Sequence, residues 1–137
     1  MGTMRTIEDN KLIAEFIGYP KNTYKEVGAK LVDNIYVWYL NDMDHYYING
    51  DWIDEVQLRF DTDWNWIMKA VDKIESMSYA KGRHYYLLID QSHVQIRIDR
   101  MNYQPYGKWG STNDKLKSIH NAVIEFINFY NRQQNEN

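Results

Sequence analysis

The chain has 137 residues, carries a formal net charge of −3 at pH 7 and contains no cysteine. A chain of this length can bury a stable hydrophobic core without disulfide bonds or a structural metal ion, so we expect a single domain over residues 1–137. The lack of cysteine excludes disulfides, thiolate metal sites and cysteine nucleophiles, and it favours a cytoplasmic location. The acidic balance argues against direct binding to nucleic acid, because such domains normally carry a basic surplus.

The sequence predicts neither a signal peptide nor a membrane-spanning segment. Residues 1–5 lack the apolar run of a signal peptide, and nowhere do eighteen uncharged apolar residues follow one another. We therefore expect a protein that is not exported and does not span a membrane. Because Met1 and Met4 stand three residues apart, we expect Met4 to be the native start and residues 1–3 to come from a cloning vector. Residues 133–137 are expected to be a frayed tail.

The first predicted element is a helix over residues 7–17, where apolar residues recur at helical spacing. Thr6 and Asp9 resemble a capping box, and Gly18 provides a stop. The stretch 21–30 is polar and without periodicity, so a loop with at most one helical turn is expected there.

Three strands are predicted to follow this loop. Residues 34–40 are β-branched and aromatic, which is typical of a strand. Residues 41–44 are expected to turn the chain into a second strand at 45–48. Asn49-Gly50 tolerates the positive φ angles of a type I′ turn and predicts a hairpin to a third strand at 52–60.

A second helix is predicted over 64–77, with an N-cap among residues 61–63. A hairpin of strands 84–89 and 93–100 follows, and a third helix is predicted over 114–132. The sequence thus predicts an α+β fold in which a mainly antiparallel sheet of about five strands packs with three helices. The expected order is α-β-β-β-α-β-β-α, with no internal repeat and no linker between domains.

Charge is spread unevenly along the chain. Seven acids and one base lie between Asn41 and Asp63, whereas bases outnumber acids after Tyr79. This pattern predicts an acidic and a basic region, which suits the steering of a partner and equally suits an ordinary solvated surface. The candidate acidic partner surface comprises Asp42, Asp44, Asp51 and Asp54.

Aromatic residues make up 15% of the chain, more than a fold of this size can bury completely. On the second predicted helix, Trp64 and Trp66 point about 200° apart, which places Trp66 in the core and Trp64 at the surface. The loop 101–112 combines aromatic rings with cations that can stack a base and neutralise a phosphate, although packing over a sheet edge explains it equally well. The candidate binding residues are Trp64, Arg97, Tyr103, Tyr106, Lys108 and Trp109.

No catalytic set stands out in the sequence. The four histidines are scattered singly, and none forms the i, i+4 pair of a zinc site. Glycine-rich phosphate loops and nucleophile-elbow serines are absent as well. Asp61 and Asp63 resemble a metal-binding pair, but carboxylates are also expected at a helix N-terminus. We therefore expect no catalytic residue, no metal and no cofactor.

Three segments of the chain resemble a known family. Residues 10–19 (NKLIAEFIGY), 60–76 (FDTDWNWIMKAVDKIES) and 121–131 (NAVIEFINFYN) are similar to the phage α-β-α sandwich domain family of small phage and prophage proteins. That family shows Trp-Asp-Trp-Leu-Met-Pro where residues 64–69 read WNWIMK, so an amide replaces an acid at Asn65. If that acid is catalytic in relatives, this chain lacks it. The resemblance implies a phage protein in the cytoplasm of a bacterial host, and it does not extend over the aromatic segment before Phe60.

The sequence favours a non-enzymatic, phage-like accessory protein that binds a host protein or a nucleotide-like signalling molecule, as an inhibitor or sponge in counter-defence. Two other functions stay open. One is a metal-dependent enzyme acting on nucleotides or nucleic acid through Asp61 and Asp63. The other is an acidic DNA mimic that uses the residues 42–63. Exposed rings and opposite charge poles favour a homodimer, and a monomer stays open too.

Overall fold

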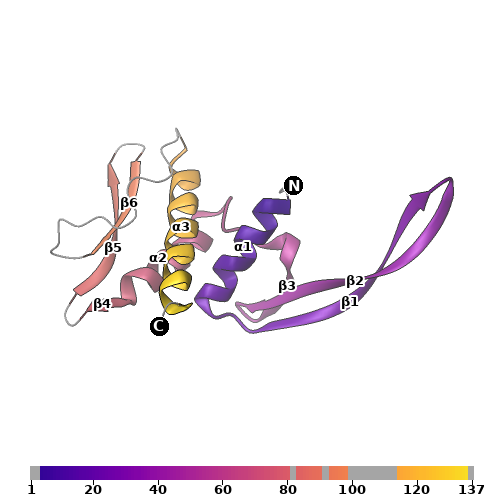
Figure 1. Ribbon diagram of the computed structural model, residues 1–137, viewed down its shortest axis with the longest axis horizontal. Helices are drawn as coiled ribbons and strands as arrows, with labels where there is room; N and C mark the ends of the chain where they lie inside the picture. The colour runs from indigo at the N-terminus through magenta and orange to yellow at the C-terminus, as the bar shows by residue number, and fades with distance from the viewer. Residues whose placement is uncertain (1–3, 81–82, 91–92, 99–113, 136–137) are drawn as a thin grey trace.

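The computed structural model describes residues 4–80, 83–90, 93–98 and 114–135 (Figure 1). Within these residues the elements are α1 (Met4–Ile17), β1 (Lys21–Val32), β2 (Ile35–Ile48), β3 (Asp51–Asp54), the 3₁₀ turn η1 (Glu55–Gln57), α2 (Trp64–Ser76), β4 (Ser78–Ala80), β5 (Arg83–Asp90), β6 (His93–Ile98) and α3 (Lys115–Asn135). The strands form two antiparallel sheets, β1-β2-β3 and β4-β5-β6. The α+β class is confirmed, but two sheets replace the single sheet that was expected.

The three helices form the middle of the molecule and separate the two sheets (Figure 1). α2 packs against β5, α3 packs against β6, and α1 contacts both of the other helices. On the opposite side, β1 and β2 extend away from the helices as a long ribbon, with β3 beside its inner end. The chain therefore has a compact body and a ribbon that leaves it.

The hydrophobic core lies where the helices meet one another and the β5-β6 hairpin. The Phe126 ring of α3 is fully buried and meets Tyr85 of β5 edge-on, with ring centroids 4.7 Å apart. Phe16 of α1 contacts the same ring at 6.2 Å. Buried residues recur at helical spacing on the helices and at alternate positions of β6, which confirms the predicted periodicity. They include Ile13, Ala14, Ile67, Ala70, Val71, Ile74, Ile119, Val123, Ile127, Val94 and Ile96.

A buried polar network joins α1 to α3 and to the segment after η1. Asn10 donates from Nδ2 to the carbonyl oxygen of Leu58 at 3.2 Å and to Oδ1 of Asp61 at 2.9 Å. Because both partners can only accept, the orientation of the amide is fixed, and Oδ1 of Asn10 faces Nε2 of His120 at 3.0 Å. The proton of the His120 ring therefore sits on Nε2. These mutual hydrogen bonds allow Asn10 and His120 to be buried without unsatisfied donors at these positions.

The β1-β2-β3 sheet differs most from the prediction. Residues 21–30, expected as a loop, belong to β1, and residues 41–44 continue β2 instead of turning the chain. The turn lies at Asp33 and Asn34, whose φ angles are 50° and 66°. Asp and Asn adopt this left-handed conformation more readily than other non-glycine residues, and two such residues in succession fit a tight hairpin turn.

The third predicted strand is much shorter than expected. It ends at Asp54, whose carboxylate accepts from the backbone N–H groups of Val56 and Gln57 at 3.1 and 3.2 Å and thereby starts η1. The Asn49-Gly50 turn between β2 and β3 is confirmed, with φ angles of 53° and 89°.

The helix boundaries also need small corrections. α1 already includes Met4, so Thr6 lies inside the helix and does not cap it. Asp63 is the N-cap of α2, as predicted, and accepts from the N–H of Asn65 at 2.9 Å. α3 continues to Asn135, through the first part of the expected tail.

We predict that Asn10→Ala lowers the free energy of unfolding by about 2–4 kcal/mol, because the Nε2–H of His120 and the acceptors Leu58 and Asp61 lose their buried partner. Asn22→Ala is the matched control. Asn22 is exposed and makes one side-chain bond, to the hydroxyl of Tyr24, so its change should stay within about 0.5 kcal/mol. Chemical denaturation measures both, and equal losses in the two variants would contradict the structural role of the network.

Candidate functional site

The ribbon formed by β1 and β2 is the most unusual feature of the molecule. Its two strands pair without a bulge, from Lys21 opposite Tyr46 to Val32 opposite Ile35. In the described part of the chain, β3 is the only further strand that pairs with it, and it reaches only residues 45–48. Just beyond that point the N–H of Asp44 donates to Oε1 of Glu55 at 3.0 Å, and farther out no described strand adjoins either edge of the ribbon, so both edges present unpaired backbone groups.

The inner half of the ribbon is polar and anchored to the body. Tyr46 is fully buried and donates its hydroxyl to Oε2 of Glu15 in α1 at 2.9 Å. Asp44 accepts from Oγ1 of Thr23 at 2.6 Å and forms an ion pair with Nζ of Lys11 at 3.0 Å. The hydrogen bond from Thr23 and the nearby Lys11 ammonium hold the pKa of the Asp44 carboxyl below its usual value. The ribbon is therefore fixed to the body at its inner end, around Asp44 and Tyr46, which we call the root.

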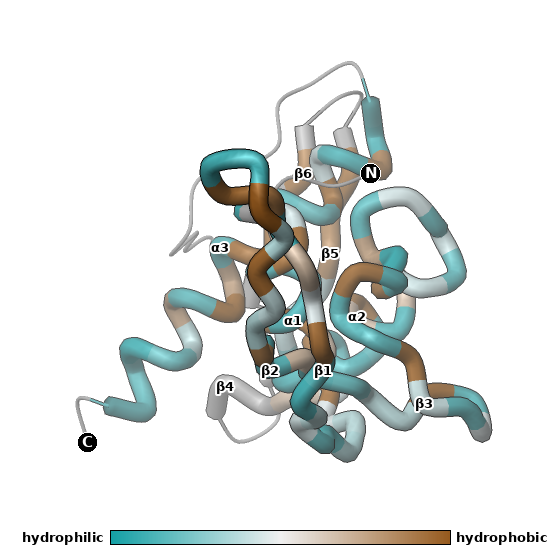
Figure 2. The backbone as a smooth tube through the Cα atoms, turned by 90° about the vertical axis from the view of Figure 1, so that its right-hand side faces the viewer, coloured by the Kyte–Doolittle hydropathy of each residue, from teal (hydrophilic) through white to brown (hydrophobic). Residues whose placement is uncertain are grey.

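The outer half of the ribbon, residues 27–40, is apolar, and we call it the distal arm. It contains only two charged residues, Lys30 and Asp33. Figure 2, viewed from the outer end of the ribbon, shows brown hydrophobic stretches on both strands next to the teal turn. Nine large apolar side chains of the distal arm are between 41% and 71% exposed, namely Val27, Leu31, Val32, Ile35, Tyr36, Val37, Trp38, Tyr39 and Leu40.

Cross-strand partners share a face of the ribbon, so the pairing divides the distal arm into two faces. The first, which we call the Trp38 face, is apolar throughout. Its large side chains are each between 58% and 71% exposed. It consists of the pairs Val27–Leu40, Ala29–Trp38 and Leu31–Tyr36.

The other face, which we call the Tyr39 face, partly covers itself. A Cβ atom added to Gly28 would lie 2.5 Å from Cζ of Tyr39, so the tyrosine ring rests directly over the glycine. The ammonium of Lys30 stands 5.9 Å from the centroid of the same ring. This face consists of the pairs Gly28–Tyr39, Lys30–Val37 and Val32–Ile35.

The apolar surface of the distal arm is too large for an ordinary monomer surface. The nine side chains expose on the order of 1,000 Å², whereas the largest apolar patch on a typical monomer is about 300–600 Å². An isolated two-stranded ribbon is also only marginally stable in water. The distal arm therefore has the properties of a contact surface.

Of the six candidate binding residues, Trp64 and Arg97 lie in the described part of the chain. Trp64 is 46% exposed at the start of α2, while Trp66 is partly buried and packs edge-on against Phe60 at 5.2 Å, as predicted. Arg97 lies on β6 opposite Tyr86. The remaining candidates lie outside the described residues; they are Tyr103, Tyr106, Lys108 and Trp109.

The four candidate acidic residues do not stand as a free negative surface. Asp42 forms an ion pair with Nζ of Lys25 at 2.7 Å, and Asp44 is paired with Lys11 and Thr23. Asp54 caps η1. Asp51 is exposed at the start of β3. Three of these four carboxylates are thus already engaged within the chain.

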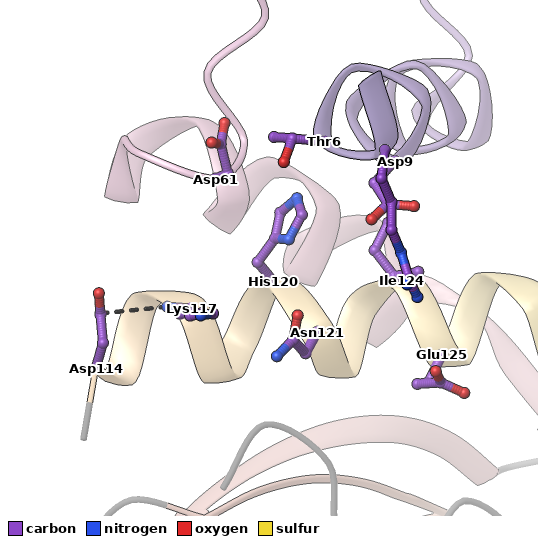
Figure 3. Close-up of a pocket in the computed structure, with 10 residues that line it drawn as sticks. Thr6, Asp9, Asp61, Asp114, Lys117, His120, Asn121, Ile124 and Glu125 are labelled. Atoms are coloured by element: carbon purple, nitrogen blue, oxygen red, sulfur yellow. Dashed lines mark hydrogen bonds between the residues drawn. The ribbon is translucent and has the colours of Figure 1, made fainter. Parts of the chain in front are cut away.

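A polar cavity of about 700 Å³ lies between α1 and α3 (Figure 3). In Figure 3 the ring of His120 extends from α3 toward Asp61 and Thr6, with Asp9 on the α1 side. Burial lowers the pKa of His120, and the carboxylates of Asp61 and Asp9 oppose that shift. Side chains of both charges line the cavity, including Arg5 and Asp9. The lining therefore defines no single class of ligand.

Metal binding finds no support in the described part of the chain, where no group of three or more His, Asp or Glu side chains is placed to hold an ion. Asp61 accepts from Asn10, and Asp63 caps α2. Both residues of the metal-like pair therefore have structural roles.

Comparisons with protein-family models, with curated proteins and with solved structures find no match for this chain. The resemblance to the phage α-β-α sandwich domain family therefore stays a prediction. Among the described helices, none combines the length and apolar character needed to cross a membrane.

We predict that the protein loses stability as the pH falls through the ordinary histidine pKa of 6.5. The unfolded chain protonates this imidazole more readily than the folded chain, because the His120 pKa is lowered on folding, so stability rises with pH in this window. The free energy of unfolding, measured between about pH 7.5 and about pH 5.5, should fall less steeply in His120→Gln. The control is His84→Gln, at an exposed position, which should keep the slope. An unchanged slope in His120→Gln would refute the assignment.

Proposed function

We propose that the chain is a binding protein and that the distal arm is the surface through which it binds another protein. One observation carries this proposal: nine large apolar side chains are held in solvent on a ribbon that projects from the body. Burial of apolar surface stabilises a complex by about 25 cal/mol per Å². Covering on the order of 1,000 Å² therefore contributes roughly 25 kcal/mol to the free energy of binding, from which the entropic and desolvation costs of association are subtracted. That contribution is large enough for a stable complex.

The chemistry of the distal arm favours a protein as the occupant. Lys30 is its single base and is balanced by Asp33, so the arm offers no cationic track for phosphates. Insertion into lipid hydrocarbon would leave the open backbone edges of both strands without hydrogen bonds, at several kcal/mol per group. A protein partner can supply both apolar side chains and backbone groups to an exposed edge.

The root of the ribbon supports the same function. Contacts of Tyr46 with Glu15 and of Asp44 with Lys11 join β2 to α1. The arm is consequently presented in a defined direction before any partner arrives, which reduces the ordering entropy lost on binding.

Counter-defence in a bacterial host is a narrower form of this proposal, and it rests on the resemblance to phage proteins. An inhibitor or sponge requires only surface complementarity, so a projecting binding arm suits that role. The enzyme and DNA-mimic alternatives are less favoured, because Asp61, Asp63, Asp42 and Asp44 already have partners within the chain.

Photo-crosslinking in the cells that produce the protein tests this proposal. We predict that p-benzoyl-phenylalanine in place of Trp38 gives covalent adducts with protein on irradiation, because the 71% exposed ring lies in the contact surface. The same substitution at Met68, which is 37% exposed on the body, is the control and should give few adducts. If positions 36, 38 and 40 give no protein adduct of any mass, the distal arm is not a protein-binding surface.

A further inference from the structure

The Trp38 face is more open than the Tyr39 face and identifies the side of the arm that a partner covers. Its large side chains are all at least 58% exposed. On the Tyr39 face, Val32, Val37 and Tyr39 are only 41–42% exposed and the Tyr39 ring already rests on Gly28, so that Ile35 beside the turn, at 66%, is its one comparably open large side chain. A partner therefore removes more apolar surface from water at the Trp38 face.

We propose that the partner is a second copy of the chain and that the two distal arms pack face to face through their Trp38 faces about a two-fold axis. This inference rests on the proposed function and names the protein that the arm binds. In such an isologous contact the same surface serves both copies, so each arm covers the apolar side chains of the other.

The buried area agrees with a stable homodimer. Each Trp38 face exposes roughly 600–700 Å² of apolar side chain, so two such faces packed together bury about 1,200–1,400 Å², at the lower end of the roughly 1,200–2,000 Å² in total that stable interfaces bury. Homodimer interfaces are also more apolar than transient ones and poor in charged residues at their centre. The Trp38 face between Val27 and Leu40 contains no charged residue.

Charge and shape favour self-association as well. The distal arm has one base and one acid, Lys30 and Asp33, so two arms carry no net charge that would repel. Two ribbons of the same sequence also have the same twist, which lets them stay in contact over their length.

A partner that covers this much apolar surface must be present whenever the chain is present. Exposed apolar ribbons with open edges associate non-specifically when they stay uncovered. A second copy is present whenever the chain is present, and it covers the arm at every chain concentration above the dissociation constant of the dimer. The observations therefore favour a second copy over a foreign protein.

Sedimentation equilibrium of the purified full chain tests the proposal. The wild-type chain should be a dimer, and Trp38→Lys should raise the dissociation constant on the order of 100-fold or more, because the two-fold contact loses two anchoring rings and gains two buried charges. Met68→Lys, at a 37% exposed position of α2, is the control and should leave the constant unchanged. Far-ultraviolet circular dichroism should show intact helices in both variants, since both side chains are exposed.

Because the chain has no cysteine, single engineered cysteines report which faces meet. Under mild oxidation, at least one of Ala29→Cys, Leu31→Cys and Trp38→Cys should form a disulfide-linked dimer, because positions near a two-fold axis approach their own counterparts within about 7 Å. Val37→Cys, on the Tyr39 face, should not. Crosslinks from Val37→Cys alone, or from both faces equally, would overturn the face-to-face arrangement.

A chain that stays monomeric at every concentration would overturn the proposal, and so would flotation of that monomer with phosphatidylcholine–phosphatidylglycerol vesicles. These results are distinguishable from failure of the proposed function. Adducts of the position 38 crosslinker with other proteins alone would refute the second copy and keep the binding arm. Absence of all adducts would refute both.

Discussion

A two-stranded ribbon has two faces and two open edges, and it cannot bury any of them by itself. This constraint separates the two parts of the molecule. In the body, the helices and the β5-β6 hairpin cover one another, and Phe126 and Tyr85 meet in a core that excludes water. In the distal arm no element of the described chain covers Trp38 or Tyr36. Within the described residues the arm therefore stays open to solvent, and this is the observation from which the proposed contact surface follows.

The ribbon changes character along its length. Near the root, polar pairs such as Thr23 with Asp44 and Lys25 with Asp42 satisfy each other across the strands. Exposed pairs of this kind add little stability, but they make the inner half compatible with water. Farther out, the same pairing brings aliphatic and aromatic side chains together. The polar half lies between the body and the apolar distal arm, which is the proposed contact surface.

The sequence predicts the body much better than the ribbon, for a physical reason. Helices such as α2 and α3 bury one face, so their apolar residues recur at a readable spacing. β1 is exposed along nearly its whole length and buries no face, so the alternation that marks a strand is missing. The polar residues of its inner half consequently looked like a loop. Asp33 and Asn34, which stand between aliphatic residues, were the available signal for the position of the turn. The polar segment 41–44 was an equally plausible position for that turn.

The surplus of aromatic rings correctly predicted that some rings are exposed, but it did not locate the distal arm. Trp64 was correctly expected to be exposed, yet the larger surface consists of Tyr36, Trp38 and their neighbours. Their grouping depends on the register of β1 against β2. Register cannot be read from one strand when its partner has been interpreted as a loop. The helical segments that carry the phage resemblance lie in the body, so they gave no information about the arm.

The hydrogen bond between Asn10 and His120 spans 110 residues of the chain, and it affects how the protein is made. During synthesis the arm leaves the ribosome long before α3 exists, so the body cannot close while the apolar ribbon is already in solution. For that interval the nascent chain exposes the apolar side chains of the arm to solvent while its body is still incomplete. Slower translation lengthens this interval, and with it the time in which the apolar arm can associate with other chains.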